Sequence, residues 1–122
     1  MELRRKSLRR AVARELTAAE EEEYLSPWRT EDATRSWTAG AAAADARYTT
    51  ELVGPLRELG LPTLLLWGEA DEFQPPSYAR RFEREVPNAH LVALPGARHI
   101  PMEDDPERVA QELSRFCGGR QP

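Results

Sequence analysis

The chain has 122 residues, enough for one domain, and its 40% hydrophobic and 31% charged residues lie within the range of globular proteins. A net charge of -4 gives no reason to expect nucleic acid as a partner, and no run approaches the roughly 18 apolar residues of a membrane span. We therefore expect a protein that binds neither nucleic acid nor membrane. The single cysteine, Cys117, cannot form an internal disulfide, which fits a reducing compartment, so we expect a cytoplasmic protein.

The chain begins with a basic segment, residues 1–16. Leu8, Val12 and Leu16 fall at helical spacing among six Arg and Lys residues. This pattern predicts a helix with one buried stripe and a solvated basic face. A basic amphipathic helix that binds an anionic membrane is the alternative interpretation.

Two more helices are predicted before residue 50. Thr17-Ala18-Ala19-Glu20 has the form of a capping box, and the acidic run 20–23 reads as a solvated face. Ser26-Pro27 breaks this helix, since proline disfavours helical geometry in the residue before it. Thr30 can then cap a third helix.

The second half of the chain predicts alternating helices and strands. Thr50 is expected to cap a helix that ends before Gly60, and residues 63–67 form an apolar run typical of a parallel strand covered on both faces. A helix beginning at Pro75-Pro76, a second strand over residues 91–94 and a last helix opened by Asp105-Pro106 follow. The residues expected to face the core of these two helices are Tyr78, Phe82 and Val86, and then Val109, Leu113 and Phe116.

Each predicted strand is followed by a turn that carries a chemically useful side chain. The first turn is Trp67-Gly68-Glu69-Ala70-Asp71 and the second is Gly96-Ala97-Arg98-His99. Because neighbouring parallel strands end at the same edge of a sheet, where open α/β sheets place their ligand sites, we expect Asp71 and His99 to lie close together. A carboxylate beside an imidazole can fix the tautomer of the histidine while the histidine moves a proton.

These two turns resemble the acid turn and the histidine turn of α/β-hydrolases. The resemblance implies an α/β fold, here a partial α/β-hydrolase fold with a helical cap-like segment over residues 1–49. Residues 50–122 would form the C-terminal lobe, a β-α-β-α unit with two parallel strands. It further implies hydrolysis of a small organic substrate such as an ester, halide or epoxide, without a metal or organic cofactor.

The family's triad runs in the order nucleophile, acid, histidine. The resemblance makes Asp71 the orienting acid and His99 the general base, but no Gly-x-Ser-x-Gly motif occurs in the 122 residues. The missing N-terminal half would supply the nucleophile, and the two turns do not distinguish a serine, as in esterases, from an aspartate, as in dehalogenases and epoxide hydrolases. Among the chain's five serines Ser77 is the nearest to Asp71 along the chain, and a cap or first-turn role in a helix explains it.

The alternative is a catalytically inert truncated protein or interaction module, or one chain of a split enzyme. Arg98 favours it, because family members commonly carry glycine there, and arginine at a positive φ would be strained by about 1–3 kcal/mol.

The chain alone is also expected to associate with itself or stay partly molten, since isolated two-stranded sheets are marginal in water.

Other candidate residues receive structural interpretations. Tyr24, Trp28 and Trp37 belong to the cap-like segment, either as its small core or as the lining of a substrate pocket. His90 opens the second strand at the end opposite the site and is expected to be structural or exposed. Cys117 is expected to be a small buried hydrophobe.

Overall fold

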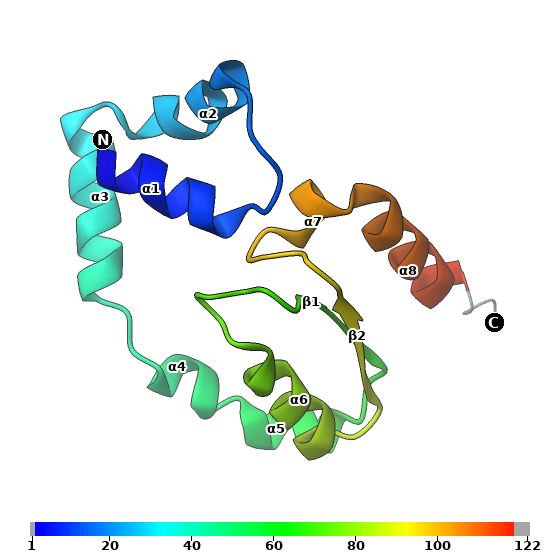
Figure 1. Ribbon diagram of the computed structural model, residues 1–122. Coiled ribbons are helices and arrows are strands. Elements are labelled where there is room, and N and C mark those ends of the chain that lie inside the picture. The colour runs from blue at the N-terminus through cyan, green and yellow to red at the C-terminus, as the bar shows by residue number, and fades with distance from the viewer. Residues whose placement is uncertain (1, 119–122) are drawn as a thin grey trace.

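The computed structural model describes residues 2–118, and Figure 1 shows their arrangement. The elements in chain order are α1 (Glu2–Ala11), α2 (Ala18–Leu25), the 3-10 turn η1 (Ser26–Trp28), α3 (Glu31–Ala42), α4 (Arg47–Thr50), α5 (Val53–Leu59), β1 (Thr63–Gly68), α6 (Pro76–Glu85), β2 (Ala89–Leu94), α7 (Pro101–Asp104) and α8 (Pro106–Gly118). No helix in this range is long and apolar enough to cross a membrane.

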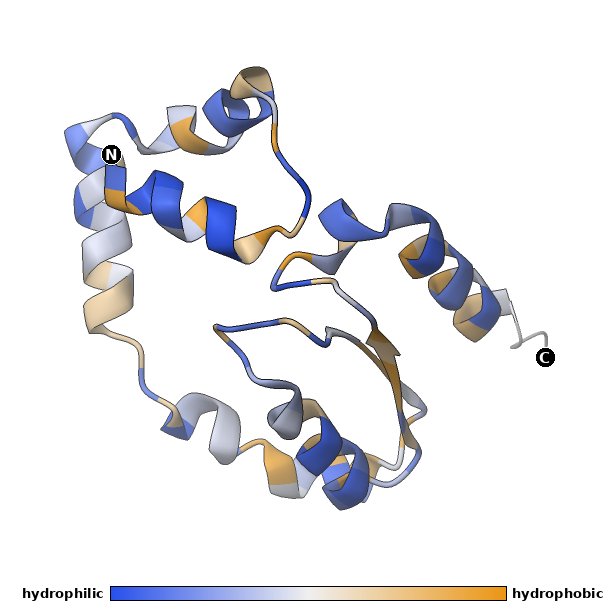
Figure 2. Ribbon diagram, in the orientation of Figure 1, coloured by the Kyte–Doolittle hydropathy of each residue, from blue (hydrophilic) through white to orange (hydrophobic). Residues whose placement is uncertain are grey.

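The two strands form a parallel pair, as predicted. Their register runs from Thr63 opposite Ala89 to Gly68 opposite Leu94, so both strands end at the same edge of the sheet. In Figure 1, α6 lies on one side of the strands and α8 on the other. The strands are among the most hydrophobic segments of the chain in Figure 2, as expected where helices lie on both sides.

Two small hydrophobic clusters hold the described residues together. One lies on the α8 side of the sheet, where Val109 packs with Leu94 and Ala97 and with partly buried strand residues. The other joins the N-terminal helices: its residues are Leu8, Val12 and Leu25, with Leu16 and Ile100 packed against them. Because Ile100 follows β2 in sequence, this second cluster fixes the N-terminal helices to the end of the sheet.

Helix α1 is shorter than the predicted segment, because it ends at Ala11. Leu8, Val12 and Leu16 still share one cluster, but only Leu8 is helical. Long-range hydrogen bonds explain the early end. The amide of Ile100 donates to the Ala11 carbonyl (3.0 Å), and the amide of Ala13 donates to the Asp104 carboxylate (2.6 Å).

The capping box at Thr17 is confirmed, but the acidic run after it is only partly solvated. Thr17 Oγ1 accepts a hydrogen bond from the Glu20 amide, and the Glu20 side chain accepts one from the Thr17 amide. Glu21 is buried, because Arg9 donates to it from α1 (2.5 Å) and Arg5 lies 3.2 Å from it. The prediction of a fully solvated acidic face was therefore wrong at Glu21.

The predicted cap at Thr50 was also wrong. Thr50 is the last residue of α4, and its hydroxyl donates back to the Ala46 carbonyl (3.0 Å) instead of capping the next helix. Helix α5 starts at Val53, which places Pro55 in its first turn, where the missing amide hydrogen costs no helical hydrogen bond. Gly60 ends this helix at φ 57°, the left-handed conformation expected of a glycine cap.

The buried faces of the last helices agree only in part with the predicted stripes. Val86, at the end of α6, is buried as predicted, but the buried residue within α6 is Ala79, and Tyr78 is 58% exposed. On α8, Val109 is buried as predicted, but Leu113 is 47% exposed and Cys117 is exposed as well. Helical spacing determines which residues share a face of the helix. It does not determine how much of that face the packed strands and helices cover.

Candidate active site

Asp71 and His99 come together beyond the carboxyl ends of the two strands. Asp71 follows β1 and His99 follows β2, and His99 Nδ1 lies 3.0 Å from Asp71 Oδ2. The proximity predicted from the two turns is therefore present. It follows from the parallel register, which ends both strands at the same level.

The Asp71 carboxylate is buried and fully engaged. Its Oδ1 accepts hydrogen bonds from the amides of Phe73 (2.8 Å) and Gln74 (2.9 Å), and its Oδ2 faces His99. Burial acts to raise the pKa of Asp71, but the hydrogen bonds from Gln74, His99 and Phe73 outweigh it, so the pKa lies below its ordinary value.

The ionised carboxylate decides the tautomer of the histidine. A carboxylate can only accept, so His99 Nδ1 carries the hydrogen and donates it to Asp71. In the neutral ring this leaves the lone pair on Nε2, which is therefore the atom that can take a proton.

The side chain of His99 is partly open to solvent. Its side chain is 43% exposed, whereas the Asp71 side chain is 5% exposed. The Phe73 ring lies against the imidazole with centroids 5.3 Å apart, and the Arg10 guanidinium lies 5.2 Å from the centroid of Phe73. One side of the imidazole is thus held by the acid turn.

Gly68 lets the two turns approach each other closely. A Cβ built on Gly68 would lie 2.2 Å from the Arg98 carbonyl oxygen and 2.4 Å from that of Ala97. Next to it, the Ala70 amide donates to the Ala97 carbonyl (2.9 Å) and continues the pairing of the strands into the turns. The glycine of the acid turn is therefore required by space, since its own φ is not positive.

Arg98 is not strained, so the expected penalty for its place before the histidine was wrong. Within residues 2–118 the one non-glycine residue with positive φ is Asn88. The Arg98 side chain instead reaches the end of α1, where Nη1 donates to the carbonyls of Arg9 (3.1 Å) and Val12 (3.4 Å). A cation suits this place, because helix carbonyls point there without helical partners.

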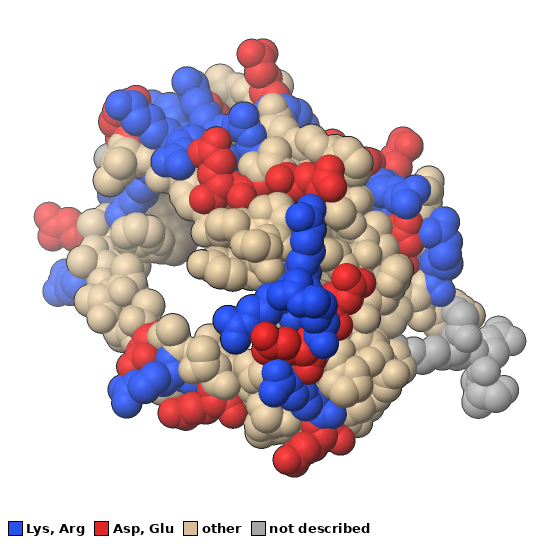
Figure 3. All heavy atoms as spheres, turned by 60° about the horizontal axis from the view of Figure 1, so that its bottom comes forward, with Lys and Arg blue, Asp and Glu red and all other residues tan. Residues whose placement is uncertain are grey.

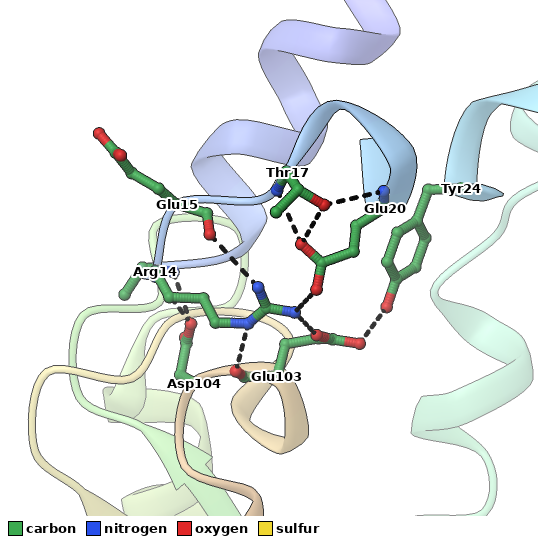
Figure 4. Close-up of polar contacts among 8 residues, drawn as sticks. Arg14, Glu15, Thr17, Glu20, Tyr24, Glu103 and Asp104 are labelled. Carbon is green, nitrogen blue, oxygen red and sulfur yellow. Dashed lines mark hydrogen bonds and ion pairs between the residues drawn. The ribbon is translucent and has the colours of Figure 1, made fainter. Parts of the chain in front are cut away.

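A polar network joins the N-terminal helices to α7, the short helix that follows the histidine turn (Figure 4). Arg14 donates to Glu20 Oε1 (2.8 Å) and Glu103 Oε2 (2.5 Å), and the Tyr24 hydroxyl donates to Glu103 Oε1 (2.6 Å). The guanidinium and the Thr17 hydrogen bonds hold the pKa of Glu20 down to about 2. The two contacts of Glu103 connect parts of the chain about eighty to ninety residues apart.

Tyr24, Trp28 and Trp37 line one pocket of about 650 Å³. The Arg4 guanidinium lies 5.9 Å from the Trp28 ring centroid and 5.7 Å from that of Trp37, and it donates to the Trp28 carbonyl. Since Tyr24 and Trp37 remain partly exposed, these residues form the wall of a pocket and not a closed core.

His90 lies apart from the site, as predicted. It is in β2 near the end opposite the two turns, its side chain is 73% exposed, and its Nδ1 is 3.8 Å from Glu83 Oε1. Across residues 2–118 no three His, Cys, Asp or Glu side chains come together as metal ligands.

Sequence reasoning missed two contributors to the site. Phe73 is only two residues beyond Asp71, so its place in the acid turn was a usable signal. Asp104 lies only six residues beyond Arg98, from whose amide it accepts a hydrogen bond, but its second contact, with Ala13 about ninety residues away, leaves no mark in local spacing.

The comparisons with known proteins agree with this geometry. The model of the alpha/beta hydrolase family matches residues 2–112. Haloalkane dehalogenase 2 of Mycobacterium bovis is 44% identical over 58 residues, which are 47% of this chain and 20% of that protein. The pimeloyl-[acyl-carrier protein] methyl ester esterase of Pectobacterium atrosepticum is 33% identical over 67 residues, 55% of this chain and 26% of that protein.

A solved structure resembles almost the whole chain. The serine hydrolase involved in carbazole degradation, the CarC enzyme, superposes with a TM-score of 0.71 over 94% of this chain and 46% of its own, and at 19% identity this likeness concerns the fold. The chain thus spans about a quarter or less of the two curated relatives and less than half of that structure. The described fold is a partial α/β-hydrolase fold, and the chain belongs to the alpha/beta hydrolase family.

Proposed function

We propose that this chain supplies the acid and the histidine of a nucleophile–histidine–aspartate triad in a hydrolase. The observation that carries the proposal is the 3.0 Å contact between His99 Nδ1 and the buried, ionised Asp71 carboxylate. With Nδ1 engaged, Nε2 is the free base, and the 43% exposure of the side chain leaves room for a nucleophile from another segment to reach it.

In this mechanism His99 acts as general base and then as general acid. Nε2 takes the proton of the nucleophile or of the attacking water, and Asp71 stabilises the imidazolium that forms without itself becoming protonated. The nucleophile and the oxyanion hole would come from a segment outside these 122 residues, on the same polypeptide or on a partner chain.

The substrate is proposed to be a small organic molecule of the ester, halide or epoxide class. One relative is named a haloalkane dehalogenase and another a methyl ester esterase, and both resemble this chain over about half of its length. A serine nucleophile would suit the ester and an aspartate the halide or epoxide.

Residues 1–49 are proposed to act as a cap over the site and residues 50–122 as the lobe that bears it. Two features support the cap: an aromatic-walled cavity within the N-terminal helices and the packing of those helices on the chain after His99. The wall of this cavity, which Tyr24, Trp28 and Trp37 share, is then the surface that selects the substrate.

The test uses protein captured from its native source with an antibody against α8. Capture brings along the nucleophile-bearing segment whether it belongs to the same polypeptide or to a partner, and intact mass distinguishes the two. We expect hydrolysis of p-nitrophenyl butyrate or release of halide from 1-bromobutane. His99→Ala should lower kcat by about 10⁴–10⁶-fold, the range seen when triad members are removed.

His90→Ala is the matched control, because His90 is the other histidine of the chain and lies at the far end of β2. It should leave turnover unchanged. Equal turnover by the wild type and His99→Ala would refute the proposed role of His99. Absence of turnover from every captured form would support the inert protein or interaction module instead.

A further inference from the structure

The histidine turn is fixed to the end of α1 by hydrogen bonds on both sides of His99. On the residue before it, the Arg98 side chain donates to the Arg9 and Val12 carbonyls. On the residue after it, the Ile100 amide donates to the Ala11 carbonyl (3.0 Å). The backbone of the histidine turn therefore depends on where α1 ends.

One carboxylate spans this junction. Asp104, the last residue of α7, accepts hydrogen bonds at Oδ1 from the amides of Ala13 (2.6 Å) and Arg14 (3.2 Å). Its Oδ2 accepts from the Arg98 amide (2.7 Å). Figure 4 shows this carboxylate beneath the loop that follows α1. Asp104 thus connects three segments through backbone groups, and one of those groups belongs to the residue before His99.

The neighbouring acid, Glu103, serves a different purpose. Its carboxylate accepts hydrogen bonds from the side chains of Arg14 and Tyr24 and holds α7 to the N-terminal helices. The carboxylates of these two acids therefore have different partners: that of Glu103 contacts side chains, and that of Asp104 contacts the backbone of the histidine turn.

We propose that Asp104 is a positioning residue for His99. By fixing the Arg98 amide it fixes the direction in which the next residue projects its imidazole, and the 3.0 Å contact with Asp71 depends on that direction. A displacement of about 1 Å at such a contact can cost about 100-fold in rate. The catalytic meaning of this role rests on the proposed function, but the geometry can be tested without turnover.

The test measures the tautomer of His99 in the full chain labelled with ¹⁵N-histidine. The chain contains two histidines, and solid-state ¹⁵N spectra of the neutral rings distinguish Nδ1–H from Nε2–H in any state of assembly. The wild type should show His99 mainly as the Nδ1–H tautomer. In Asp104→Asn the ratio of Nδ1–H to Nε2–H should fall by about tenfold, the effect of losing one charge-assisted hydrogen bond.

Two controls separate positioning from general loosening. Glu103→Gln changes the other acid of α7 and should leave the His99 ratio unchanged, and the exposed His90 should keep its ratio in every variant. If Asp104→Asn does not fold, Asp104→Glu keeps the charge and moves the carboxylate by one methylene, and the ratio should fall by about threefold.

Four results would overturn the proposal: a wild-type His99 ratio equal to that of His90, an unchanged ratio in Asp104→Asn, an unchanged ratio in Asp104→Glu, or an equal fall in Glu103→Gln. None of these depends on hydrolysis. A captured protein without turnover would refute the proposed function and leave the positioning role standing. An unchanged His99 ratio in Asp104→Asn would refute the positioning role and leave the proposed function standing.

Discussion

At the scale of single residues, the site depends on a glycine that has no chemistry of its own. Gly68 ends β1, and the space that a side chain would need there is filled by the carbonyls of Ala97 and Arg98. These carbonyls belong to the turn that carries His99, so any side chain at Gly68 pushes the histidine turn away from the acid turn. Backbone atoms cannot rotate aside as a flexible side chain would.

We therefore expect Gly68→Ala to lower the free energy of unfolding by about 3 kcal/mol, at the upper end of the usual cost of overpacking. Gly40→Ala is the matched control. Gly40 lies in α3 with nothing within 4 Å of its added Cβ, so this change should raise stability by about 0.5–1 kcal/mol through helix propensity. Denaturant midpoints at one fixed protein concentration compare the two, and a Gly68→Ala midpoint at or above the wild type would contradict the packing argument.

At the scale of elements, local sequence signals determine the caps and turns, whereas long-range contacts determine where α1 ends. The cap at Thr17, the stop at Gly60 and the two turns at the ends of the strands were predictable, because each depends on neighbours within a few residues. The end of α1 was not, since bonds from Ile100 and Asp104 determine it. The Asp71–His99 pair could be predicted from the sequence, but the anchoring of its histidine turn could not.

The network of Arg14, Glu20, Tyr24 and Glu103, which joins the α1–α2 loop and α2 to α7, should make stability depend on acid pH. The pKa of Glu20 falls from 4.5 to about 2, mainly through its hydrogen bond from Arg14, and the pKa of Glu103 is lowered by Tyr24 and then by Arg14. A carboxyl whose folded pKa is lowered stabilises the fold above its unfolded pKa, and this stability is lost as the pH falls toward the folded pKa. The window therefore lies between about pH 4.5 and 2.

We expect the melting temperature followed by circular dichroism to decline through this window, and Glu20→Gln to reduce the decline. Part of the decline in melting temperature should remain in Glu20→Gln, because Asp71 also has a lowered pKa and loses its contribution to stability in acid. Arg14→Met should reduce the decline as Glu20→Gln does, since it removes the same pair. A wild-type profile that stays level down to pH 2 would show that solvent screening cancels these pairs.

At the scale of the whole molecule, the described chain exposes more surface than a compact protein of its mass. Its accessible surface is 8886 Å² at 13.8 kDa, whereas a folded monomer of that mass exposes about 6,600 Å². The excess, roughly 2,000 Å², equals one subunit's share of a large obligate interface. Figure 3 shows an opening that passes through the molecule, in keeping with this loose packing.

Exposed apolar side chains contribute to this surface. A groove of about 780 Å³ runs between the α4–α5 segment and α6, and Leu52 and Leu56 in its wall are exposed. In the described residues the sheet contains two strands, so each strand has one edge without a strand partner. Figure 2 shows hydrophobic positions gathered on α5 and on the strands, which places both features in the same part of the molecule.

We therefore expect the 122-residue chain, produced alone, to associate with itself through this apolar surface. A molecule that buries this excess of roughly 2,000 Å², with the exposed leucines of the groove in the contact, gains more free energy from apolar burial than it loses in translational and rotational freedom. Sedimentation velocity at low and high concentration should show species larger than 13.8 kDa that grow with concentration. Leu56→Lys, which places a charge in the groove, should shift this equilibrium toward the monomer, whereas Arg35→Lys on the exposed face of α3 should not. A monomer at every concentration that also melts in one cooperative calorimetric transition would contradict the prediction, and would mean that the small clusters around Leu25 and Leu94 suffice to hold the fold.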